Sequence, residues 1–334
     1  MLLMPLRSWP SLFRRTRIRV GGWLRAQGHY RITREIGSGG MAKVYLAEKL
    51  GYGGFSKLFA VKVIKTDAVR DPVVRDMFVN EARLTANLIH TNIVQVASLQ
   101  RFRDEYVIIM EYVFGKTLLE FIQRHKELGR PVPLDLGAYI IGRVCRGLDY
   151  AHNKHDRHGK PVRIVHRDIC PSNILISYRG VPKLSDFGVA KSLFWKTPSE
   201  KSMVVGKYPY MAPEQVRRQG TDARSDIYAL SLVMYELFTG QIAYDVENTA
   251  MLREQLDAQR LRPPVELSPD LPQGINDIIV RGAATDPNDR FQSAKEMSLE
   301  LEAFLLRHWL FPTEEKLAEY MVELFPEAKN HRWW

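Results

Sequence analysis

The chain has 334 residues, of which 45% are hydrophobic and 26% charged, enough apolar material for one large two-lobed domain or two smaller ones. Its two cysteines, Cys145 and Cys170, are too few for a disulfide framework or a cysteine metal cluster, which favours a reducing, cytoplasmic location. No apolar run has the length of a membrane-spanning helix, so we expect no integral membrane segment.

The net charge of +10 belongs mainly to one end of the chain. Residues 1–34 contain eight arginines and no acidic residue, so everything after them carries only about +2. That remainder shows no cluster of basic and aromatic residues of the kind that binds bases. We therefore expect no nucleic-acid partner.

Residues 1–28 are expected to form a basic leader outside the folded domain. They mix arginines with Trp, Phe and Leu, and contain prolines and a Gly-Gly pair. Such a composition fits peripheral contact with an anionic membrane, and it also fits an organelle transit peptide. Our main interpretation is a disordered leader, or sequence upstream of the true start.

From Tyr30 onward, short alternating apolar runs predict strands, followed by a long helical region. Strands are expected at 30–33, 44–47 and 59–64, then near 93–99 and 106–110, with helical spacing at 71–88 between them. After Leu118 the longest amphipathic runs are 134–152, 223–239 and 293–308. This order predicts an α+β fold in which a small β-rich lobe precedes a larger helical lobe, within a domain at 29–310.

Residues 311–334 are predicted to form a C-terminal helical extension with an aromatic end. Two interpretations stay open: the helix packs on the back of the domain, or it docks a partner.

A glycine-rich turn is expected between the first two strands. Glycines there let backbone N–H groups approach phosphate oxygens without a Cβ in the way. Alone the pattern is weak, because the third glycine of G-x-G-x-x-G is replaced by Ala42. The candidate nucleotide-binding residues of this segment are Ile36, Gly37, Ser38, Gly39, Gly40 and Val44.

The third expected strand places Lys62 after Ala60 and Val61, in an apolar setting that a lysine tolerates only when it is paired. Glu81 on the following helix is the expected partner, and the pair would hold the α- and β-phosphates of a nucleotide. The run that ends at Glu111 and Val113 would supply a hinge whose backbone faces the adenine; Ala60 would line the same site.

Taken together, these segments resemble the eukaryotic-like Ser/Thr protein kinases, and among them the bacterial branch, from about Tyr30 to Leu310. The motifs that carry the resemblance occur in order, and they are the glycine loop, Lys62, Glu81, His166-Arg167-Asp168, Asn173, Asp186-Phe187-Gly188 and Ala212-Pro213-Glu214. The resemblance implies a two-lobed kinase fold, ATP and Mg²⁺ as cofactors, and protein substrates.

The resemblance also implies individual roles. Asp168 would orient the attacking hydroxyl as the catalytic base, while Asn173 and Asp186 would bind magnesium. Two further residues have structural roles, Glu214 in a buried bridge with Arg290 and Asp226 as a cap on the backbone of the catalytic loop. His166 is expected to be a packed residue and not a base.

Two positions depart from the family pattern. Cys170 stands where a phosphate-contacting lysine is usual, and Lys207 replaces the usual threonine after Gly206. We predict that Lys207 supplies the missing charge. The position where tyrosine kinases carry a compensating arginine is Ser172, which argues against tyrosine specificity. The alternatives are a pseudokinase used as a binding module and, less favoured, a small-molecule kinase.

The segment between Asp186 and Glu214 contains four hydroxyls that phosphorylation could use: Ser192, Thr197, Ser199 and Ser202. Arg167 resembles the arginine that captures a phosphate on this segment. We expect autophosphorylation there, most of all at Ser199 or Ser202.

Overall fold

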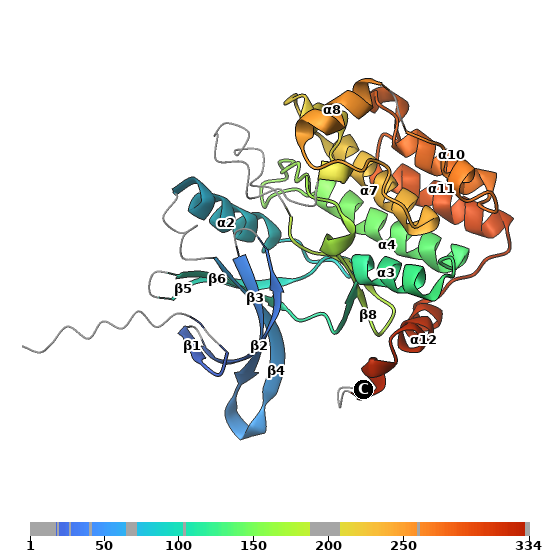
Figure 1. Cartoon of the computed structure of the whole chain (residues 1–334). Helices are drawn as coiled ribbons and strands as arrows, with labels where there is room; N and C mark the ends of the chain where they lie inside the picture. Colours follow the sequence, from blue (N-terminus) through green and yellow to red (C-terminus); the bar gives the residue numbers. More distant parts are fainter. Residues whose placement is uncertain are drawn as a thin grey trace, which may run out of the picture.

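The structure is a computed structural model that describes residues 18, 20–26, 28–39, 42–64, 72–102, 105–187, 208–258 and 261–330. A sheet-rich small lobe is followed by a larger helical lobe (Figure 1). The expected two-lobed α+β architecture is therefore confirmed.

Within the described residues, six strands of the small lobe form one antiparallel sheet in the order β1-β2-β3-β4-β6-β5. Their bounds are β1 (Trp23–Ala26), β2 (Gly28–Ser38), β3 (Ala42–Leu50), β4 (Ser56–Ile64), β5 (Val96–Phe102) and β6 (Glu105–Glu111). Helix α2 (Pro72–Thr85) covers one face of this sheet. Alternation along β4 explains the two layers, because Val61 and Val63 pack on one face while Ala60 and Ile64 pack on the other.

The expected leader boundary at residue 28 is wrong for its last residues. Strand β1 lies inside the range 1–28 and pairs with β2, with Leu24 opposite Tyr30. Leu24 is fully buried in the apolar layer that also contains Tyr30 and Ile32. The strand escaped prediction because a four-residue segment gives almost no periodic signal. Residues 1–17 lie outside the described part of the chain.

The large lobe is built around two long helices, α4 (Leu134–His152) and α7 (Ala223–Thr239), which match the predicted ranges. Almost every residue of α7 is buried, as expected for a helix in the middle of a lobe. The other helices are α3 (Leu118–Leu128), α6 (Pro213–Val216), α8 (Thr249–Asp257), α9 (Pro264–Leu267), α10 (Gln273–Gly282), α11 (Ala294–Arg307) and α12 (Glu314–Leu324).

A second sheet lies where the two lobes meet. Strands β7 (Gly115–Thr117), β8 (Ile174–Ser177) and β9 (Pro182–Leu184) follow each other in that order within it. Asn173 directly precedes β8, and Asp186 comes two residues after β9. This small sheet therefore positions two of the predicted metal ligands.

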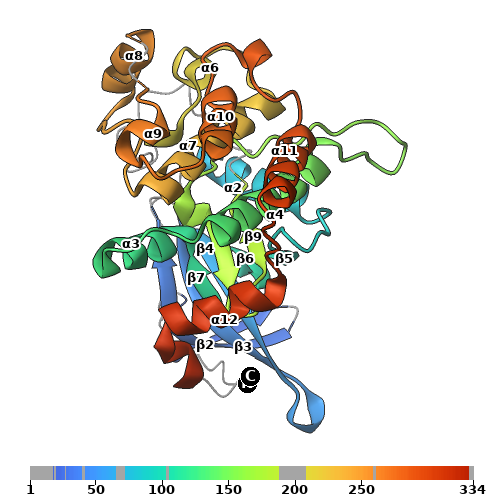
Figure 2. The same cartoon turned by 90° about the vertical axis from the view of Figure 1, so that its right-hand side faces the viewer.

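Helix α12 confirms that the C-terminal extension packs on the domain. In Figure 2 it lies across the lower end of the three-stranded sheet β7-β8-β9 and beside α3. Leu317, Met321 and Leu324 are buried in the core of the large lobe, as is Phe325 just after the helix. The short 3₁₀ segment η6 (Pro326–Asn330) ends the described chain.

Candidate active site

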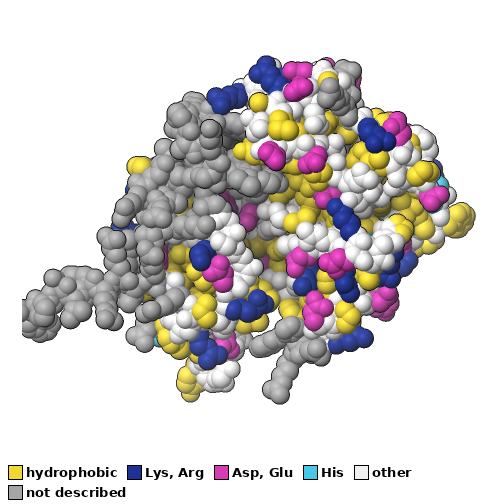
Figure 3. All heavy atoms as spheres, in the orientation of Figure 1, with side chains coloured by type: hydrophobic (Ala, Val, Ile, Leu, Met, Phe, Trp, Pro, Cys, Tyr) yellow, Lys and Arg dark blue, Asp and Glu magenta, His cyan; other side chains and the backbone are white. Residues whose placement is uncertain are grey.

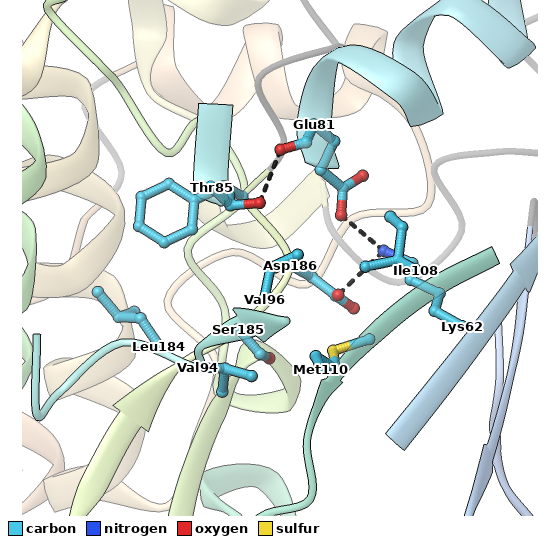
Figure 4. A pocket seen from close by; sticks show the side chains of 11 residues that line it. Lys62, Glu81, Thr85, Val94, Val96, Ile108, Met110, Leu184, Ser185 and Asp186 are labelled. Atoms are coloured by element: carbon cyan, nitrogen blue, oxygen red, sulfur yellow. Dashed lines mark hydrogen bonds and ion pairs between the residues drawn. The ribbon is translucent and has the colours of Figure 1, made fainter. Parts of the chain in front are cut away.

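Lys62 forms two ion pairs, one within the small lobe and one to the large lobe. It lies near the C-terminal end of β4, and its Nζ donates to Glu81 Oε1 at 2.8 Å and to Asp186 Oδ1 at 2.9 Å (Figure 4). The pair with Glu81 is the one predicted from sequence. The bond to Asp186 was not predicted, and it places helix α2, strand β4 and the residue after β9 around one ammonium group.

The charge states of Lys62 and Glu81 follow from their burial and from the charged groups beside them. Burial alone would lower the pKa of Lys62, but the carboxylates of Asp186 and Glu81 outweigh it and raise that pKa above its ordinary value. Burial raises the pKa of Glu81, with the charge of Asp186 adding to it and Lys62 opposing it. Lys62 is therefore a cation at neutral pH, shared between two acidic groups.

A small cavity opens beside this cluster. Figure 4 shows Lys62, Glu81 and Asp186 joined by the two ion pairs, with apolar side chains around them, among them Ile108 next to Lys62. Its lining residues are Lys62, Glu81, Thr85, Val94, Val96, Ile108, Met110, Leu184, Ser185, Asp186 and Phe187. A mostly apolar wall with a few convergent charged groups is typical of a small-molecule site.

An apolar layer of the small lobe continues from this cavity. Ala60 and Met110 are buried in it, and partly buried side chains from both lobes pack against them: Ile36, Val44, Val113 and Leu175. The predicted lining residues Ile36, Val44, Ala60 and Val113 are thus brought together. Leu175, from β8 of the large lobe, was missed in the sequence; its only signal there is its place two residues after Asn173.

The glycine-rich segment forms the predicted turn between β2 and β3. Gly37 pairs with Val44 and Ser38 with Lys43, and the N–H of Gly39 donates to the carbonyl of Ala42 at 2.9 Å. Ile36 and Val44, on the strands that flank this turn, pack against the apolar layer. Gly40, the remaining predicted residue of this loop, lies outside the described residues.

The catalytic-loop candidates Asp168 and Asn173 contact each other. The amide Nδ2 of Asn173 donates to the backbone carbonyl of Asp168 at 2.8 Å and to its carboxylate at 3.1 Å. These bonds orient both side chains, and Asp168 is only 8% exposed. An oriented, nearly buried carboxylate is suited to accept or steer a proton.

Asp226 fixes the backbone of this loop, as predicted. Its carboxylate accepts the N–H groups of His166 and Arg167, both at 2.7 Å, and the ring Nε2 of His152 at 2.8 Å. Burial opposes ionisation of Asp226, but the bond from His152 and the charges of nearby histidines hold its pKa below the ordinary value. His166 is fully buried and packs on the ring of Phe187, which confirms its packed character.

Two residues of the site adopt a left-handed backbone conformation that L-amino acids rarely use. They are Arg167, with φ = 63°, and Asp186, with φ = 54°. Such conformations carry a cost and persist where the surroundings hold them in place, which is common at functional sites. Here the holding contacts are those from Asp226 to Arg167 and from Lys62 to Asp186.

Glu111, a predicted adenine-hinge residue, has a further contact that sequence reasoning missed. Its Oε1 accepts from Lys183 Nζ at 2.8 Å and from the N–H of Gln95 at 2.9 Å. Lys183 belongs to β9, so this ion pair connects the end of β6 to the strand that leads to Asp186. No sequence motif signals it, because the two residues are 72 positions apart.

The predicted structural bridge between Glu214 and Arg290 is confirmed. Arg290 Nη1 and Nη2 donate to the two carboxylate oxygens of Glu214 at 2.8 and 2.9 Å, in a bidentate pair whose arginine side chain is fully buried. Ser225 adds a third bond to the carboxylate at 2.6 Å. The bridge ties α6 to the turn before α11.

The structure describes only one of the two positions that depart from the family pattern. Cys170 is 2% exposed, and its Sγ lies 3.2 Å from Ser172 Oγ. Lys207 and the four candidate phosphorylation sites lie outside the described residues.

This arrangement of a paired lysine, a buried carboxylate–amide pair and a strained aspartate between two lobes defines the protein kinase class. The family model for the protein kinase domain matches residues 30–300. The chain belongs to this family.

Curated relatives include both serine/threonine and tyrosine kinases. The chain is 37% identical over 285 residues to the tyrosine-protein kinase MasK of Myxococcus xanthus, a match that covers 85% of this chain and 44% of MasK. It is 35% identical over 310 residues to the serine/threonine-protein kinase PrkC of Bacillus subtilis, covering 92% of this chain and 45% of PrkC. The chain thus spans less than half the length of these relatives.

A solved structure shows the same fold. The kinase domain of PknI from Mycobacterium tuberculosis aligns with a TM-score of 0.63 and 28% identity, over 86% of this chain and 99% of that domain. In the part of the chain that the structure describes, no helix combines the length and apolarity needed to cross a bilayer.

Proposed function

We propose that this chain is an ATP- and magnesium-dependent protein kinase that phosphorylates serine and threonine hydroxyls of proteins. The observation that carries the proposal is the position of Lys62, within 3 Å of both Glu81 and Asp186 and beside an apolar layer. In phosphoryl transfer the protein contributes mainly positioning and electrostatic stabilisation, and this geometry supplies both.

The proposed roles follow from the contacts. Lys62 holds the α- and β-phosphates, and Glu81 orients Lys62. Asp168 receives or steers the proton of the attacking hydroxyl, because its carboxylate is held in place by Asn173. Ile36, Val44, Ala60 and Val113 enclose the adenine, and the backbone of Glu111 and Val113 faces its polar edge.

Asn173 and Asp186 have the oxygen donors that a magnesium ion prefers. Because Nδ2 of Asn173 is used by Asp168, its amide oxygen is directed elsewhere, and no described residue donates to it. Bound magnesium would neutralise phosphate charge. We propose the cytoplasm, where ATP and magnesium are available, as the compartment.

Tyrosine phosphorylation is the second candidate, and the similarity to a tyrosine-protein kinase, MasK, favours it. Against it stands Ser172, at the position where tyrosine kinases carry a compensating arginine. Ser172 is instead held by the thiol of Cys170.

The decisive experiment is transfer of radiolabelled phosphate from ATP by the purified full chain, followed by phosphoamino acid analysis. We expect phosphoserine and phosphothreonine, whereas label confined to phosphotyrosine would favour the second candidate. Asp168→Asn should lower the rate by about 10²–10⁴ while retaining ATP binding, because the amide preserves the contact with Asn173.

The pseudokinase alternative makes the opposite prediction. It requires the unmodified chain to bind ATP but to transfer no label above the level of Asp168→Asn.

A further inference from the structure

The loop between α4 and the catalytic loop forms an ordered hairpin of residues 154–163 that the proposed function does not use. It stands out from the large lobe as the light-green loop after α4 in Figure 2. All residues from His155 to Arg163 are exposed, and from Ile164 onward the chain is buried again.

Although exposed, the hairpin has a defined backbone. His155 and Pro161 form an antiparallel bridge. The N–H of Val162 donates to the carbonyl of Lys154 at 2.8 Å, and the N–H of Asp156 donates to the carbonyl of Lys160 at 2.9 Å. The carboxylate of Asp156 accepts the N–H groups of His158 and Lys160 at 2.8 and 3.0 Å, which fixes the turn.

The side chains of this hairpin are strongly basic. It carries four cations, Lys154, Arg157, Lys160 and Arg163, together with two histidines. Its one acidic residue, Asp156, is occupied by backbone N–H groups.

None of these four cations forms an ion pair within the described residues. Lys154 donates to the hydroxyl of Tyr150, and Arg157 donates to the ring of His158. Elsewhere on the large lobe several exposed arginines are paired with carboxylates, namely Arg130, Arg146, Arg262, Arg281 and Arg307. Figure 3 shows the corresponding mixture of positive and negative side chains on the face opposite to the hairpin.

We propose that the hairpin of residues 154–163 is a docking site for an acidic segment of a partner protein. Guanidinium and ammonium groups on a backbone that is already ordered bind carboxylates without the cost of ordering the loop. A membrane surface is the less suitable occupant, because the tip is His158-Gly159 and the hairpin has no aromatic residue to enter an interface. Its base lies three residues before His166, so an occupied hairpin would hold the partner next to the catalytic loop.

The test measures binding of a fluorescein-labelled peptide of alternating Glu and Gly to the full chain at low salt, by fluorescence polarisation. A Gln-Gly peptide is the uncharged control. We expect Arg157→Glu combined with Lys160→Glu to weaken binding of the Glu peptide at least about fivefold, since two attractions become repulsions. Raising the salt concentration should weaken the unmodified interaction.

A matched variant distinguishes the effect of the hairpin charges on binding from the effect of the net charge of the chain. Arg253→Glu with Arg262→Glu changes the total charge equally on another exposed surface, and it should leave the affinity within about twofold. The arginines of residues 1–34 contribute the same background to every variant. Asp156→Asn keeps the turn's acceptor oxygen and removes the hairpin's only negative charge, so it should bind the Glu peptide more tightly.

Three results would overturn the proposal. The first is equal weakening by both double variants. The second is unchanged affinity in the hairpin variant. The third is loss of binding to phosphatidylserine vesicles, but not to the Glu peptide, when the hairpin charges are reversed. Kinase activity of the hairpin variants toward ATP reports whether they remain folded.

Discussion

Cys170 is the residue at which the site departs most from the kinases it resembles. It lies two residues after Asp168 and is almost fully buried, so its thiol cannot replace a long cationic side chain directed at a phosphate. If the site uses a compensating cation, another residue supplies it, and Lys207, after Gly206, is the candidate predicted from the sequence.

We predict that Lys207→Thr lowers kcat by roughly 10²–10³, the usual effect of removing one preorganised charge donor. Adding Cys170→Lys to that variant should restore much of the rate. Steady-state kinetics of the single and double variants measures the coupling. An unchanged kcat in Lys207→Thr would show that the two exchanges are unrelated.

A second prediction at this scale concerns phosphorylation. Arg167 lies beside Asp168 with its Nε bonded to Thr221, so a phosphate on the segment 192–202 would have a cationic partner at the catalytic loop. Mass spectrometry of protein incubated with ATP should find phosphate on Ser199 or Ser202. Full activity after alanine replacement of Ser192, Thr197, Ser199 and Ser202 would contradict a regulatory role.

Two of the side-chain pairs in and near the site, Lys62–Glu81 and Glu214–Arg290, were predicted from the sequence. The contacts of Lys62 with Asp186 and of Lys183 with Glu111 were not found, because they depend on how closely the two lobes meet, over separations of 124 and 72 residues. No local pattern encodes that distance.

Among the elements, α12 and η6 have the most direct consequence for the site. Lys116 of β7 lies 3.3 Å from Glu327, and its ammonium is 5.2 Å from the ring of Phe325. A Cβ on Gly180, at the turn between β8 and β9, would overlap the backbone carbonyl of Glu314. The C-terminal segment therefore supports the sheet that connects the hinge to the metal-ligand candidates.

We predict that Phe325→Ala raises the KM for ATP roughly fivefold, equivalent to about 1 kcal/mol of lost positioning, and leaves kcat at saturating ATP nearly unchanged. Glu319→Ala, an exposed position on the helix that ends just before Phe325, is the matched control and should behave like the unmodified chain. A parallel loss of kcat and thermal stability, without a KM effect, would assign Phe325 a purely structural role.

The bridge between α6 and the turn before α11 predicts a pH dependence of stability. Burial would raise the pKa of Glu214, but the hydrogen bonds from Arg290 and Ser225 hold it below the ordinary value of 4.5. The folded state thus prefers the ionised carboxylate. This contribution is complete above about pH 5 and is lost as the pH falls through the lowered pKa of the folded state.

Urea unfolding from pH 7 down to pH 3 tests this. At neutral pH, Glu214→Gln should lower the free energy of unfolding by roughly 3–5 kcal/mol, because it leaves a buried guanidinium unpaired. The difference between the two proteins should shrink as the pH falls. A constant difference over this range would contradict a lowered pKa.

At the level of elements, the sequence predicted α4 and α7 to the residue because their apolar spacing is long and regular. It missed β1, since a four-residue edge strand is defined by its pairing with β2 and by the burial of Leu24, and neither is visible in local periodicity. Pairing of this kind is a property of the assembled sheet.

For the whole molecule, β1 changes the expected effect of shortening the N-terminus. Removal of residues 1–17 should leave kcat within about a few-fold of the intact chain, because the motifs that carry the site begin only at Ile36. Removal of residues 1–28 should lower the melting temperature clearly, since it takes Leu24 out of the small-lobe core. Equal stability of the two truncated proteins, measured by thermal unfolding, would contradict a structural role for β1.

The edge position of β1 also determines how the molecule would be oriented if its N-terminal segment were held by another structure. β1 is the outermost strand of its sheet, and the N–H of Ile18 just before it donates to Glu105, also in the small lobe. In Figure 1, β1 and α10 lie at opposite ends of the molecule. A tether through residues 1–17 would thus suspend the enzyme from its small lobe. The helical lobe would then face away from the attachment point, and the length of the tether would determine how far from that point the lobe could reach.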